Sequence, residues 1–549
     1  MKNIPNGYHK FRFWCQKVLP LVYDDSLSYY EVLCKLRNFV NELAERIANL
    51  FDEMADDIQN YVYQWLDEHP EATTTVQDGS LTINKFVQGA LEYVTPTMFG
   101  AVGDGLTDDY EKLQAMFDTG LPVLMSDKVY CTSEELVYNG NYISGTGTIK
   151  SINALERVLR CTNDYISIEG LKVDCNDLSA MGIYCIGSKI CNIQNCEVEN
   201  TENATIGRRA CAGIYTTGYY ETYIANNRLE NINRTNIDSG VISSCGINCT
   251  SDGNVVVINN YINGVKCSTQ TTDCDGIYVS SNVALSCMAL IENNIILNCT
   301  GRFIKTQTYS ADIIGNRCRL IDTSTGLFVK GIDFQRGGGC LKNNYIDYAD
   351  KAGGSSVFVH CDYNENVDRN LEISGNVFVV TNAINSVFMF EGTIAGMIDI
   401  HSNNVFTTYI NYVIRANETT HATKIKYDNN DIPFYRFWNT EGGTNFEEVY
   451  LTITGNRSRY AGNQIFDRAV NINNIVIRNN EGIVEKLLNV TMDFNKMKAF
   501  CLEYQQSGVP ITNYPSALGT PDHVFLCNLS NTLFKYYNFG TGTGGDWPK

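Results

Sequence analysis

The chain of 549 residues has little positive charge, because 42 Lys and Arg stand against 61 Asp and Glu and leave a formal net charge of -19. Binding to a nucleic-acid backbone requires clustered Lys and Arg, so this composition argues against a nucleic-acid partner. The sequence also lacks the run of about 20 apolar residues that a membrane-spanning helix requires. Hydrophobic residues nevertheless make up 44% of the chain, which excludes wholesale disorder.

Signals for metal binding and for secretion are missing as well. The 20 Cys and six His include no C-x-x-C or H-x-x-H pair, so the usual zinc spacings are absent and we expect neither a metal nor a cofactor. The amino-terminal segment has no basic stretch followed by an apolar run and a small-residue cleavage site. We therefore expect buried, unpaired Cys side chains in a protein made in a reducing cytoplasm; a few extracellular disulfides are the alternative.

A long helical period is present near the amino terminus, and no other segment of the chain has a comparable apolar stripe. Between Asp24 and His69 there is almost no Gly or Pro, and His69-Pro70 ends the pattern. Apolar residues recur there at alternating steps of three and four, at Leu33, Leu36, Val40, Leu43, Ile47, Leu50 and Met54. This heptad pattern favours self-association of the helices. An amphipathic helix packed against its own domain is the alternative.

Beyond Ser151 the helical period disappears, and a phrase containing Asn recurs eleven times, from Ile193-Gln194-Asn195 to Ile477-Arg478-Asn479-Asn480. The mean spacing between the last Asn of successive copies is 28.5 residues. A unit of this length with short period-2 runs and no helical segment predicts a right-handed parallel β-helix with one coil per unit. Asn suits the turn because it tolerates the left-handed backbone conformation, and its amide can hydrogen-bond to the next coil.

The open end of a β-helix must be covered, because its strand edges are unpaired. Just before the repeats, Asp108 and Glu111 form a capping box ahead of a short helix whose apolar face has Leu113, Met116 and Phe117. We predict that this helix is the cap. The predicted organisation is an α-helical amino-terminal anchor at 1–95, the cap at 96–150, the β-helix at 151–490 and a small carboxy-terminal β domain at 491–549.

Two segments resemble a known family. Phe99-Gly100-Ala101-Val102-Gly103-Asp104-Gly105, with Thr107-Asp108-Asp109 and Gly145-Thr146-Gly147-Thr148-Ile149, is similar to the opening of the pectate-lyase-superfamily β-helix found in bacteriophage tail spikes and appendages. The segment from Phe13 to Glu31 is similar to the amino-terminal anchor of tail proteins from phages of Gram-positive hosts. The resemblance covers residues 1–490.

This resemblance implies a homotrimeric virion spike, assembled in the cytoplasm of the bacterial host, that attaches to other tail or collar proteins through its amino-terminal region. It also implies contact with a glycan on the host surface. Two functions stay open: depolymerisation of a host polysaccharide by a glycoside hydrolase or lyase, and adhesion to it without cleavage.

One candidate catalytic group is an acidic column on the exposed face of the second apolar run in each coil. Asp333, Asp362 and Glu391 recur at steps of 29 residues, about one coil each. Carboxylates on adjacent coils could lie about 5 Å apart and those two coils apart about 10 Å, near the separations of retaining and inverting glycosidases. The nearby candidates for binding hydroxyl, uronate or phosphate groups are Lys305, Gln335, Arg336 and His360. Acidic residues that simply cover an exposed strand are the alternative.

A second candidate is Asp275. The segment Thr272-Asp273-Cys274-Asp275-Gly276-Ile277 resembles the Asn-Thr-Asp-Gly strand of polygalacturonase-type hydrolases, and Arg302-Phe303-Ile304-Lys305 is similar to their Arg-Ile-Lys. The resemblance implies an acid or base role for Asp275 and substrate contacts for Arg302 and Lys305. The adjacent Asp pair and the Gly-His-Gly of that family do not occur in the repeats, and Asp275 as a turn residue is the alternative. Tyr278 and other Tyr of this sheet offer rings on which sugars can stack.

Overall fold

The computed structural model describes residues 91–202, 210–234, 243–267, 273–281, 286–321, 330–335, 337–347, 355–361, 370–380, 384–392, 396–407, 410–417, 424–431, 436–441, 450–457, 464–466, 470–471, 474–478, 490–491, 524–530, 533–538 and 543–546. The predicted helical region lies outside the described residues, apart from 91–95.

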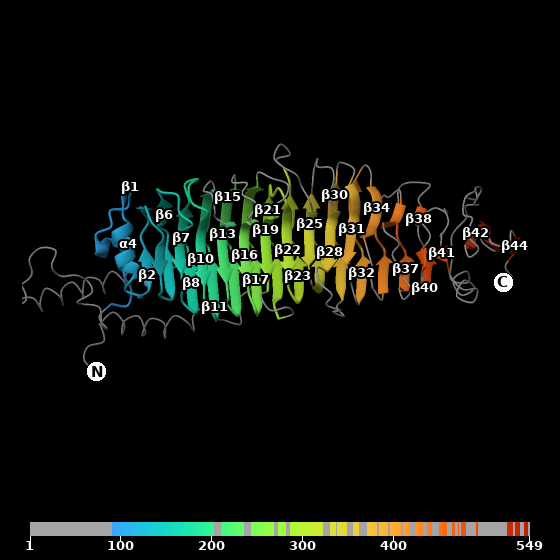
Figure 1. Ribbon diagram of the computed structural model, residues 1–549, viewed down its shortest axis with the longest axis horizontal. Helices are drawn as coiled ribbons and strands as arrows, with labels where there is room; N and C mark the ends of the chain where they lie inside the picture. Colours follow the sequence, from blue (N-terminus) through green and yellow to red (C-terminus); the bar gives the residue numbers. More distant parts are fainter. Residues whose placement is uncertain are drawn as a thin grey trace, which may run out of the picture. The chain divides into compact units, whose positions relative to one another are not determined.

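Three parallel sheets form the body of the described chain, and successive coils add one strand to each sheet in turn. Figure 1 shows these strands side by side along the sequence, from the blue cap to the orange coils. Each return to the same sheet is a crossover between parallel strands, which is right-handed in nearly all proteins. The right-handed parallel β-helix predicted from the Asn repeats is therefore confirmed.

The strands, by sheet, have the following bounds. Sheet A consists of β2 (Val123–Met125), β5 (Tyr142–Gly145), β8 (Tyr165–Glu169), β11 (Ile190–Gln194), β14 (Glu221–Ala225), β17 (Asn254–Ile258), β20 (Met288–Glu292), β23 (Ser310–Ile314), β26 (Gly338–Lys342), β29 (Leu371–Ser374), β32 (Met397–His401), β35 (Lys424–Asp428), β37 (Tyr450–Thr454) and β40 (Asn474–Arg478). Sheet B consists of β1 (Asp104–Asp108), β3 (Val129–Thr132), β6 (Thr148–Ser151), β9 (Lys172–Asp174), β12 (Glu197–Thr201), β15 (Arg228–Arg234), β18 (Tyr261–Cys267), β21 (Ile295–Leu297), β24 (Arg317–Arg319), β27 (Tyr345–Asp347), β30 (Val377–Val380) and β33 (Asn404–Thr407). Sheet C consists of β4 (Leu136–Tyr138), β7 (Arg157–Cys161), β10 (Met181–Ile186), β13 (Ala210–Thr217), β16 (Ser243–Thr250), β19 (Asp273–Ser280), β22 (Arg302–Gln307), β25 (Lys330–Gln335), β28 (Ser355–Cys361), β31 (Ile384–Gly392), β34 (Ile410–Asn417), β36 (Arg436–Glu441) and β38 (Gln464–Phe466).

A fourth sheet lies at the carboxy-terminal end of the chain. Its strands are β39 (Val470–Asn471), β41 (Val490–Thr491), β42 (Val524–Ser530), β43 (Leu533–Asn538) and β44 (Thr543–Asp546). The pairs β41–β42, β42–β43 and β43–β44 are antiparallel, whereas the strand pairs of the three coil sheets are parallel. This change of pairing agrees with the predicted β character of residues 491–549.

The core is a stack of branched apolar side chains, one above another. In sheet A the inward column includes Ile193, Ile224 and Val257, which are register partners on successive coils and fully buried. Each such side chain stabilises the fold by roughly 2 kcal/mol when fully buried. Fifteen of the Cys residues are free thiols, and all of these but Cys267 and Cys340 are buried, as the sequence predicted.

The repeated Asn phrase occupies the turn between sheets A and B and uses two positions. The first position takes the left-handed conformation, for example at Asn226 and Asn259, both with φ of 56°. The second position is buried, and its amide stacks: Asn227 donates to Asn260 Oδ1 from both its backbone N (3.0 Å) and Nδ2 (2.9 Å). This ladder consists of Asn227, Asn260, Asn294, Asn316, Asn344, Asn376, Asn403, Asn430 and Asn456.

The cap is a 3-10 turn, η2 (Pro96–Phe99), followed by helix α4 (Tyr110–Phe117). Leu113 and Phe117 are fully buried, which confirms the predicted apolar face. The predicted capping box is wrong, because the residue that precedes the helix is Asp109 rather than Asp108, and the side chain of Asp109 makes no capping hydrogen bond. Its carboxylate instead accepts the N–H groups of Val102 (2.7 Å) and Gly103 (2.9 Å), which fixes the approach to the first strand.

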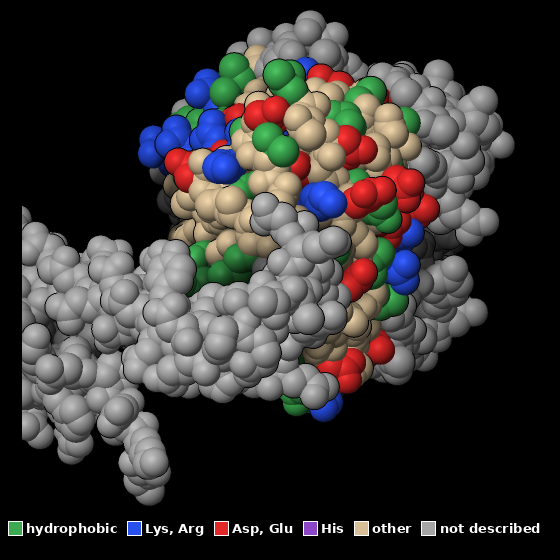
Figure 2. Space-filling model, turned by 90° about the vertical axis from the view of Figure 1, so that its left-hand side faces the viewer, with side chains coloured by type: hydrophobic (Ala, Val, Ile, Leu, Met, Phe, Trp, Pro, Cys, Tyr) green, Lys and Arg blue, Asp and Glu red, His purple; other side chains and the backbone are tan. Residues whose placement is uncertain are grey.

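Figure 2 views the end of the β-helix that carries α4. On the described part of this end, acidic, basic and hydrophobic side chains are interspersed, so neither charge sign forms a continuous field there.

Candidate functional site

The outer face of sheet C brings polar side chains from successive coils into register. Here outward residues alternate with buried inward ones such as Ile277 and Val279. The central column, defined by strand register, consists of Tyr184, Tyr215, Asn248, Tyr278, Lys305 and Asp333. Two residues further along each strand, the hydroxyl–amide column consists of Thr217, Thr250, Ser280, Gln307 and Gln335.

A buried ionic group, the Arg302 cluster, consists of Asp275, Arg302 and Asp333. Arg302 Nε donates to Asp275 Oδ1 at 2.6 Å, and its Nη1 donates to Asp333 Oδ2 at 2.9 Å. Both carboxylates are 0% exposed and Arg302 is 7% exposed. Removing charged groups from water costs several kcal/mol for each ion, which only close opposite charges can offset. A fold stabilised by apolar stacking does not require this group, so we regard it as a functional candidate.

Three further side-chain contacts lie on the same strands beside the Arg302 cluster. Lys305 Nζ lies 4.9 Å from the centroid of the Tyr278 ring, a cation–π contact. Tyr278 donates from its hydroxyl to Gln307 Oε1 at 2.5 Å, and Gln307 Nε2 donates to Gln335 Oε1. Lys305 and Gln335 are almost fully buried. Strands β19, β22 and β25 thus bring together six of the residues singled out in the sequence: Asp275, Tyr278, Arg302, Lys305, Asp333 and Gln335.

The predicted acidic column is wrong as a geometric arrangement. Asp333 is the register partner of Phe358, and Glu391 is the partner of His360, so Asp333 and Glu391 stand in different columns. Coils differ in length because residues are inserted in the turns, whereas the register follows the stacked inward side chains. Asp333 is also fully buried rather than exposed. Asp362 and Arg336 lie outside the described residues, as do the side chains of His360 and Glu391.

Neighbouring side chains cover ring faces of two tyrosines in the central column, Tyr184 and Tyr215. Tyr184 and Tyr215 stack with centroids 5.3 Å apart, and Arg157 Cζ lies 4.9 Å from the centroid of the Tyr184 ring. Burial raises the pKa of Tyr215, whose hydroxyl hydrogen-bonds to Thr250. A sugar at this part of the face would therefore contact ring edges and hydroxyl groups rather than ring faces.

Asn248 lies between Tyr215 and Tyr278 in the central column and is only 4% exposed. Its Nδ2 contacts Cys245 Sγ at 3.8 Å, whereas its buried Oδ1 accepts no hydrogen bond from the described residues. A buried carbonyl oxygen is usually satisfied, often by water or a ligand donor. Sequence reasoning missed Asn248, Gln307 and Tyr184, because only the register of unequal coils places them beside the predicted residues.

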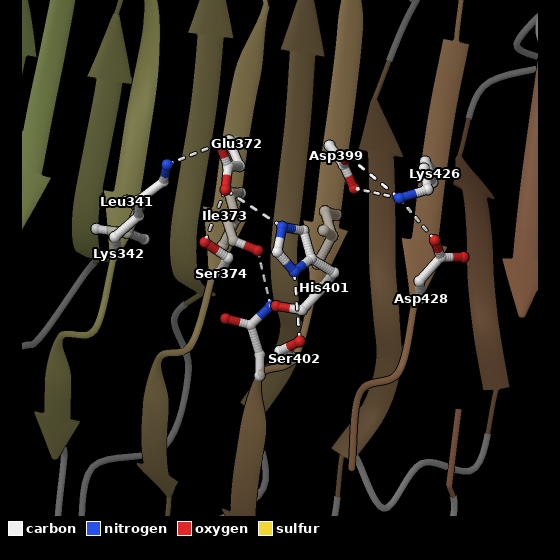
Figure 3. Close-up of polar contacts among 12 residues, drawn as sticks. Leu341, Lys342, Glu372, Ile373, Ser374, Asp399, His401, Ser402, Lys426 and Asp428 are labelled. Atoms are coloured by element: carbon white, nitrogen blue, oxygen red, sulfur yellow. Dashed lines mark hydrogen bonds and ion pairs between the residues drawn. The ribbon is translucent and has the colours of Figure 1, made fainter. Parts of the chain in front are cut away.

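A second polar group lies on the outer face of sheet A, and Figure 3 shows it. Glu372 accepts hydrogen bonds from Lys342 Nζ (2.8 Å), Ser374 Oγ (3.0 Å) and His401 Nε2 (3.2 Å). The Lys342 ammonium group and the Ser374 hydroxyl lower the pKa of Glu372, and the carboxylate raises the pKa of Lys342. Further along the sheet, Lys426 Nζ bridges the carboxylates of Asp399 (3.4 Å) and Asp428 (2.8 Å). None of these residues was identified from the sequence as a candidate site residue.

Among the described residues, no group of three or more His, Cys, Asp or Glu side chains is arranged to hold a metal ion. None of the helices in this part of the chain is long and apolar enough to cross a membrane.

No family model matches the sequence. The chain is 24% identical over 326 residues to the pre-neck appendage protein of Bacillus phage B103, an alignment that covers 52% of this chain and 36% of that protein. It is 23% identical over 145 residues to the preneck appendage protein of Bacillus phage PZA, covering 24% of this chain and 16% of that protein. The aligned part of the chain thus spans only about a third or less of the length of these relatives.

Solved structures with a similar fold come from phages and from bacteria. The tailspike protein of Pseudomonas phage LKA1 is 12% identical, with 73% of this chain and 83% of that chain covered and a TM-score of 0.37. The catalytic unit of an α-1,3-glucanase from Streptomyces thermodiastaticus is also 12% identical, with 71% and 68% covered and a TM-score of 0.38.

Proposed function

We propose, from the premise that this chain is a homologue of phage preneck appendage proteins, that it is a virion appendage which recognises a polysaccharide on the host cell surface. The observation that carries the proposal is the buried polar face of sheet C around the Arg302 cluster. As part of the same proposal, the chain assembles as a homotrimer in the host cytoplasm and attaches to tail proteins through residues 1–95.

The chemistry of this face suits a hydroxyl-rich ligand. The hydroxyl–amide column offers hydrogen-bond donors and acceptors on five successive coils. Lys305 and Arg302 add positive charge for uronate or phosphate substituents, although Arg302 already compensates two carboxylates. Repetition along the coils matches repetition along a polysaccharide, because equivalent positions recur about every 4.8 Å.

Cleavage of the bound polysaccharide is a second candidate function. The two carboxylates of the Arg302 cluster stand on β19 and β25, two coils apart, and Arg302 lies between them. Both carboxylates contact the same guanidinium group, at 2.6 Å and 2.9 Å, so their bonded oxygens lie at most about 8 Å apart, within the range of separations at which inverting glycosidases admit a water molecule. In that case Asp275 and Asp333 act as the acid and base pair, and the bound sugar replaces contacts now made by Arg302.

Cell-wall and capsular polysaccharides purified from Bacillus strains provide the test of both candidates. We expect the full chain to bind at least one of them, and we expect Asp275→Asn and Asp333→Asn to abolish any release of reducing ends or unsaturated uronate. Asp312→Asn, a substitution of an exposed carboxylate on sheet A, is the matched control and should change neither reading. Binding without release would leave adhesion as the function, and no binding by the unmodified chain would contradict the proposal.

A further inference from the structure

Ser402 occupies an unusual backbone position for its residue type. It takes the left-handed conformation, with φ of 58°, at the turn position that other coils fill with Asn or Gly, as at Asn429 and Gly375. This conformation is disfavoured for residues with a Cβ, and Asn tolerates it better than Ser does. Strained positions of this kind cluster at functional sites, and several hydrolases hold their nucleophilic serine on a strained turn.

The neighbours of Ser402 are those that a serine nucleophile requires. His401 Nδ1 lies 3.3 Å from Ser402 Oγ, and His401 Nε2 lies 3.2 Å from Glu372 Oε1 (Figure 3). The nitrogen that faces the carboxylate carries the hydrogen, so in the neutral ring Nδ1 has a lone pair that faces the serine hydroxyl. A separation of 3.3 Å is longer than an ideal hydrogen bond, but such contacts are often loose before substrate binds.

Glu372 is itself fixed by contacts beyond the histidine. Lys342 Nζ donates to its Oε2 at 2.8 Å, and Ser374 Oγ donates to its Oε1 at 3.0 Å. These contacts come from β26 and β29, so the rigid β-helix holds the carboxylate that orients the His401 ring on β32. An ionised, oriented carboxylate stabilises the imidazolium that forms when histidine accepts a proton.

We propose that Ser402, His401 and Glu372 form a second reaction site, on sheet A, that hydrolyses carboxylic esters such as acyl groups carried on sugar hydroxyls. Ser402 Oγ attacks the ester carbonyl carbon while its proton passes to His401 Nδ1. The bond to the alkoxy oxygen then breaks, the imidazolium returns the proton to that oxygen, and the alcohol leaves. Water attacks the acyl group on Ser402 in the same way, releases the carboxylic acid and restores the serine hydroxyl.

The backbone hydrogen bonds around Ser402 limit the rate acceleration that we expect from this site. The N–H of Ser402 donates to Asp428 O at 3.1 Å, and the N–H of Asn403 donates to Asn430 Oδ1 at 3.0 Å. These two donors are therefore not free to stabilise the oxyanion of the tetrahedral intermediate. The acceleration then comes mainly from the general base, which contributes typically about 10²- to 10⁴-fold.

The site is accessible and separate from the Arg302 cluster. Ser402 is exposed, and the side chains of His401 and Glu372 are 32% and 36% exposed. The Arg302 cluster, by contrast, is buried on sheet C. Ester hydrolysis therefore goes beyond polysaccharide recognition, and the two activities can be tested independently.

The full-length chain is tested with p-nitrophenyl acetate and with a fluorophosphonate probe, which reacts with activated serines as Oγ displaces fluoride from phosphorus. We expect hydrolysis and labelling at Ser402, located by mass spectrometry of the labelled peptide. Ser402→Gly should lower the hydrolytic rate by about 10²-fold or more, because His401 then has no hydroxyl group to activate as a nucleophile. This variant should fold, because Gly fills the same turn position in other coils.

Two further variants separate catalysis from structure. His401→Gln should also lose hydrolysis and labelling. The control is Ser188→Ala, which removes another exposed serine beside sheet A. The Ser188 hydroxyl donates to Asp164 at 2.7 Å, and its loss should leave hydrolysis and labelling unchanged. Hydrolysis that is equal in the unmodified chain and in Ser402→Gly, or a probe bound only at other serines, would overturn the proposal. So would an unmodified chain that hydrolyses the ester no faster than buffer.

Discussion

Arg302 illustrates how a single residue can connect stability and function. It compensates two fully buried carboxylates that stand on different coils. Removing one partner of a buried ion pair leaves charge without compensation, and this typically costs about 3–5 kcal/mol.

We therefore expect Arg302→Met to lower the free energy of unfolding by about 3 kcal/mol or more, since two carboxylates lose their partner. Urea denaturation of the β-helix measures the change. Arg317→Met removes an exposed arginine of sheet B and should have an effect within about 0.5 kcal/mol. Equal effects of the two substitutions would mean that the Arg302 cluster does not stabilise the fold.

Glu372 gives a prediction about pH. Its pKa is lowered below the ordinary value of 4.5, chiefly by the hydrogen bond from Lys342. A carboxyl group with a lowered pKa in the folded state contributes stability above its ordinary pKa, and that contribution is lost as the pH falls through the lowered value. The stability difference between the unmodified chain and Glu372→Gln should therefore be present near neutral pH and should shrink in the acid range below 4.5.

The side chain of Glu372 is 36% exposed, so screening by solvent should keep this contribution below about 1 kcal/mol. Denaturation midpoints measured across the acid range provide the comparison. A difference that grows as the pH falls would contradict the assigned direction.

At the scale of the repeated element, the sequence predicted what depends on local chemistry. The Asn phrase located the turn between sheets A and B, and inward residues such as Ile224 were recognisable from their period of two. The phrase alone did not predict that two adjacent positions, such as Asn226 and Asn227, have different structural roles. The left-handed residue and the stacked amide play different roles, and only the three-dimensional turn separates them.

The candidate sites depend on register, which the sequence determines only indirectly. Residues inserted in a turn leave the strand register unchanged but shift the position that a fixed count along the sequence reaches, and a shift of one residue already selects a side chain on the opposite face. Counting 29 residues from Asp333 therefore reached Asp362, although the partner in the next coil is Phe358. Asp275, Arg302 and Lys305 were found because a resemblance named them, whereas His401 and Ser402 had no recognisable motif.

The Asn ladder provides the prediction for this scale. Asn344→Ala deprives the backbone N–H and amide of Asn316 of their acceptor and leaves carbonyl groups without a donor. Each buried polar group left unsatisfied costs about 1–3 kcal/mol, so we expect a loss of roughly 3 kcal/mol in the free energy of unfolding. Asn343→Gly changes the preceding left-handed residue, with φ of 55°, and should be tolerated. Comparable thermal and urea unfolding of the two variants would exclude a stabilising role for the ladder.

For the whole molecule, two outer faces have different chemistry. Sheet C carries the buried Arg302 cluster, and sheet A carries the exposed group around Glu372. If both proposals hold, the appendage binds a glycan through sheet C and hydrolyses esters on sheet A, and it can modify a polymer while it remains attached.

Assembly is tested at the same scale. The heptad pattern between Asp24 and His69 favours self-association, and the resemblance to tail spikes implies that the assembly is a parallel homotrimer with cyclic symmetry. Multi-angle light scattering of the full chain should give three times the mass of one chain. A monomer over the accessible concentration range would contradict this prediction and would favour a helical region that binds other virion proteins.

The most direct test of the central claim is the equilibrium binding of the full chain to purified Bacillus cell-wall polysaccharide. We expect the unmodified chain to bind and Lys305→Met to weaken binding by about 10-fold or more, the equivalent of one charge-assisted hydrogen bond of about 1.5–3 kcal/mol. Lys172→Met, which removes a lysine of sheet B that pairs with Glu199, should bind as the unmodified chain does. Equal affinities of all three proteins would contradict recognition by the outer face of sheet C.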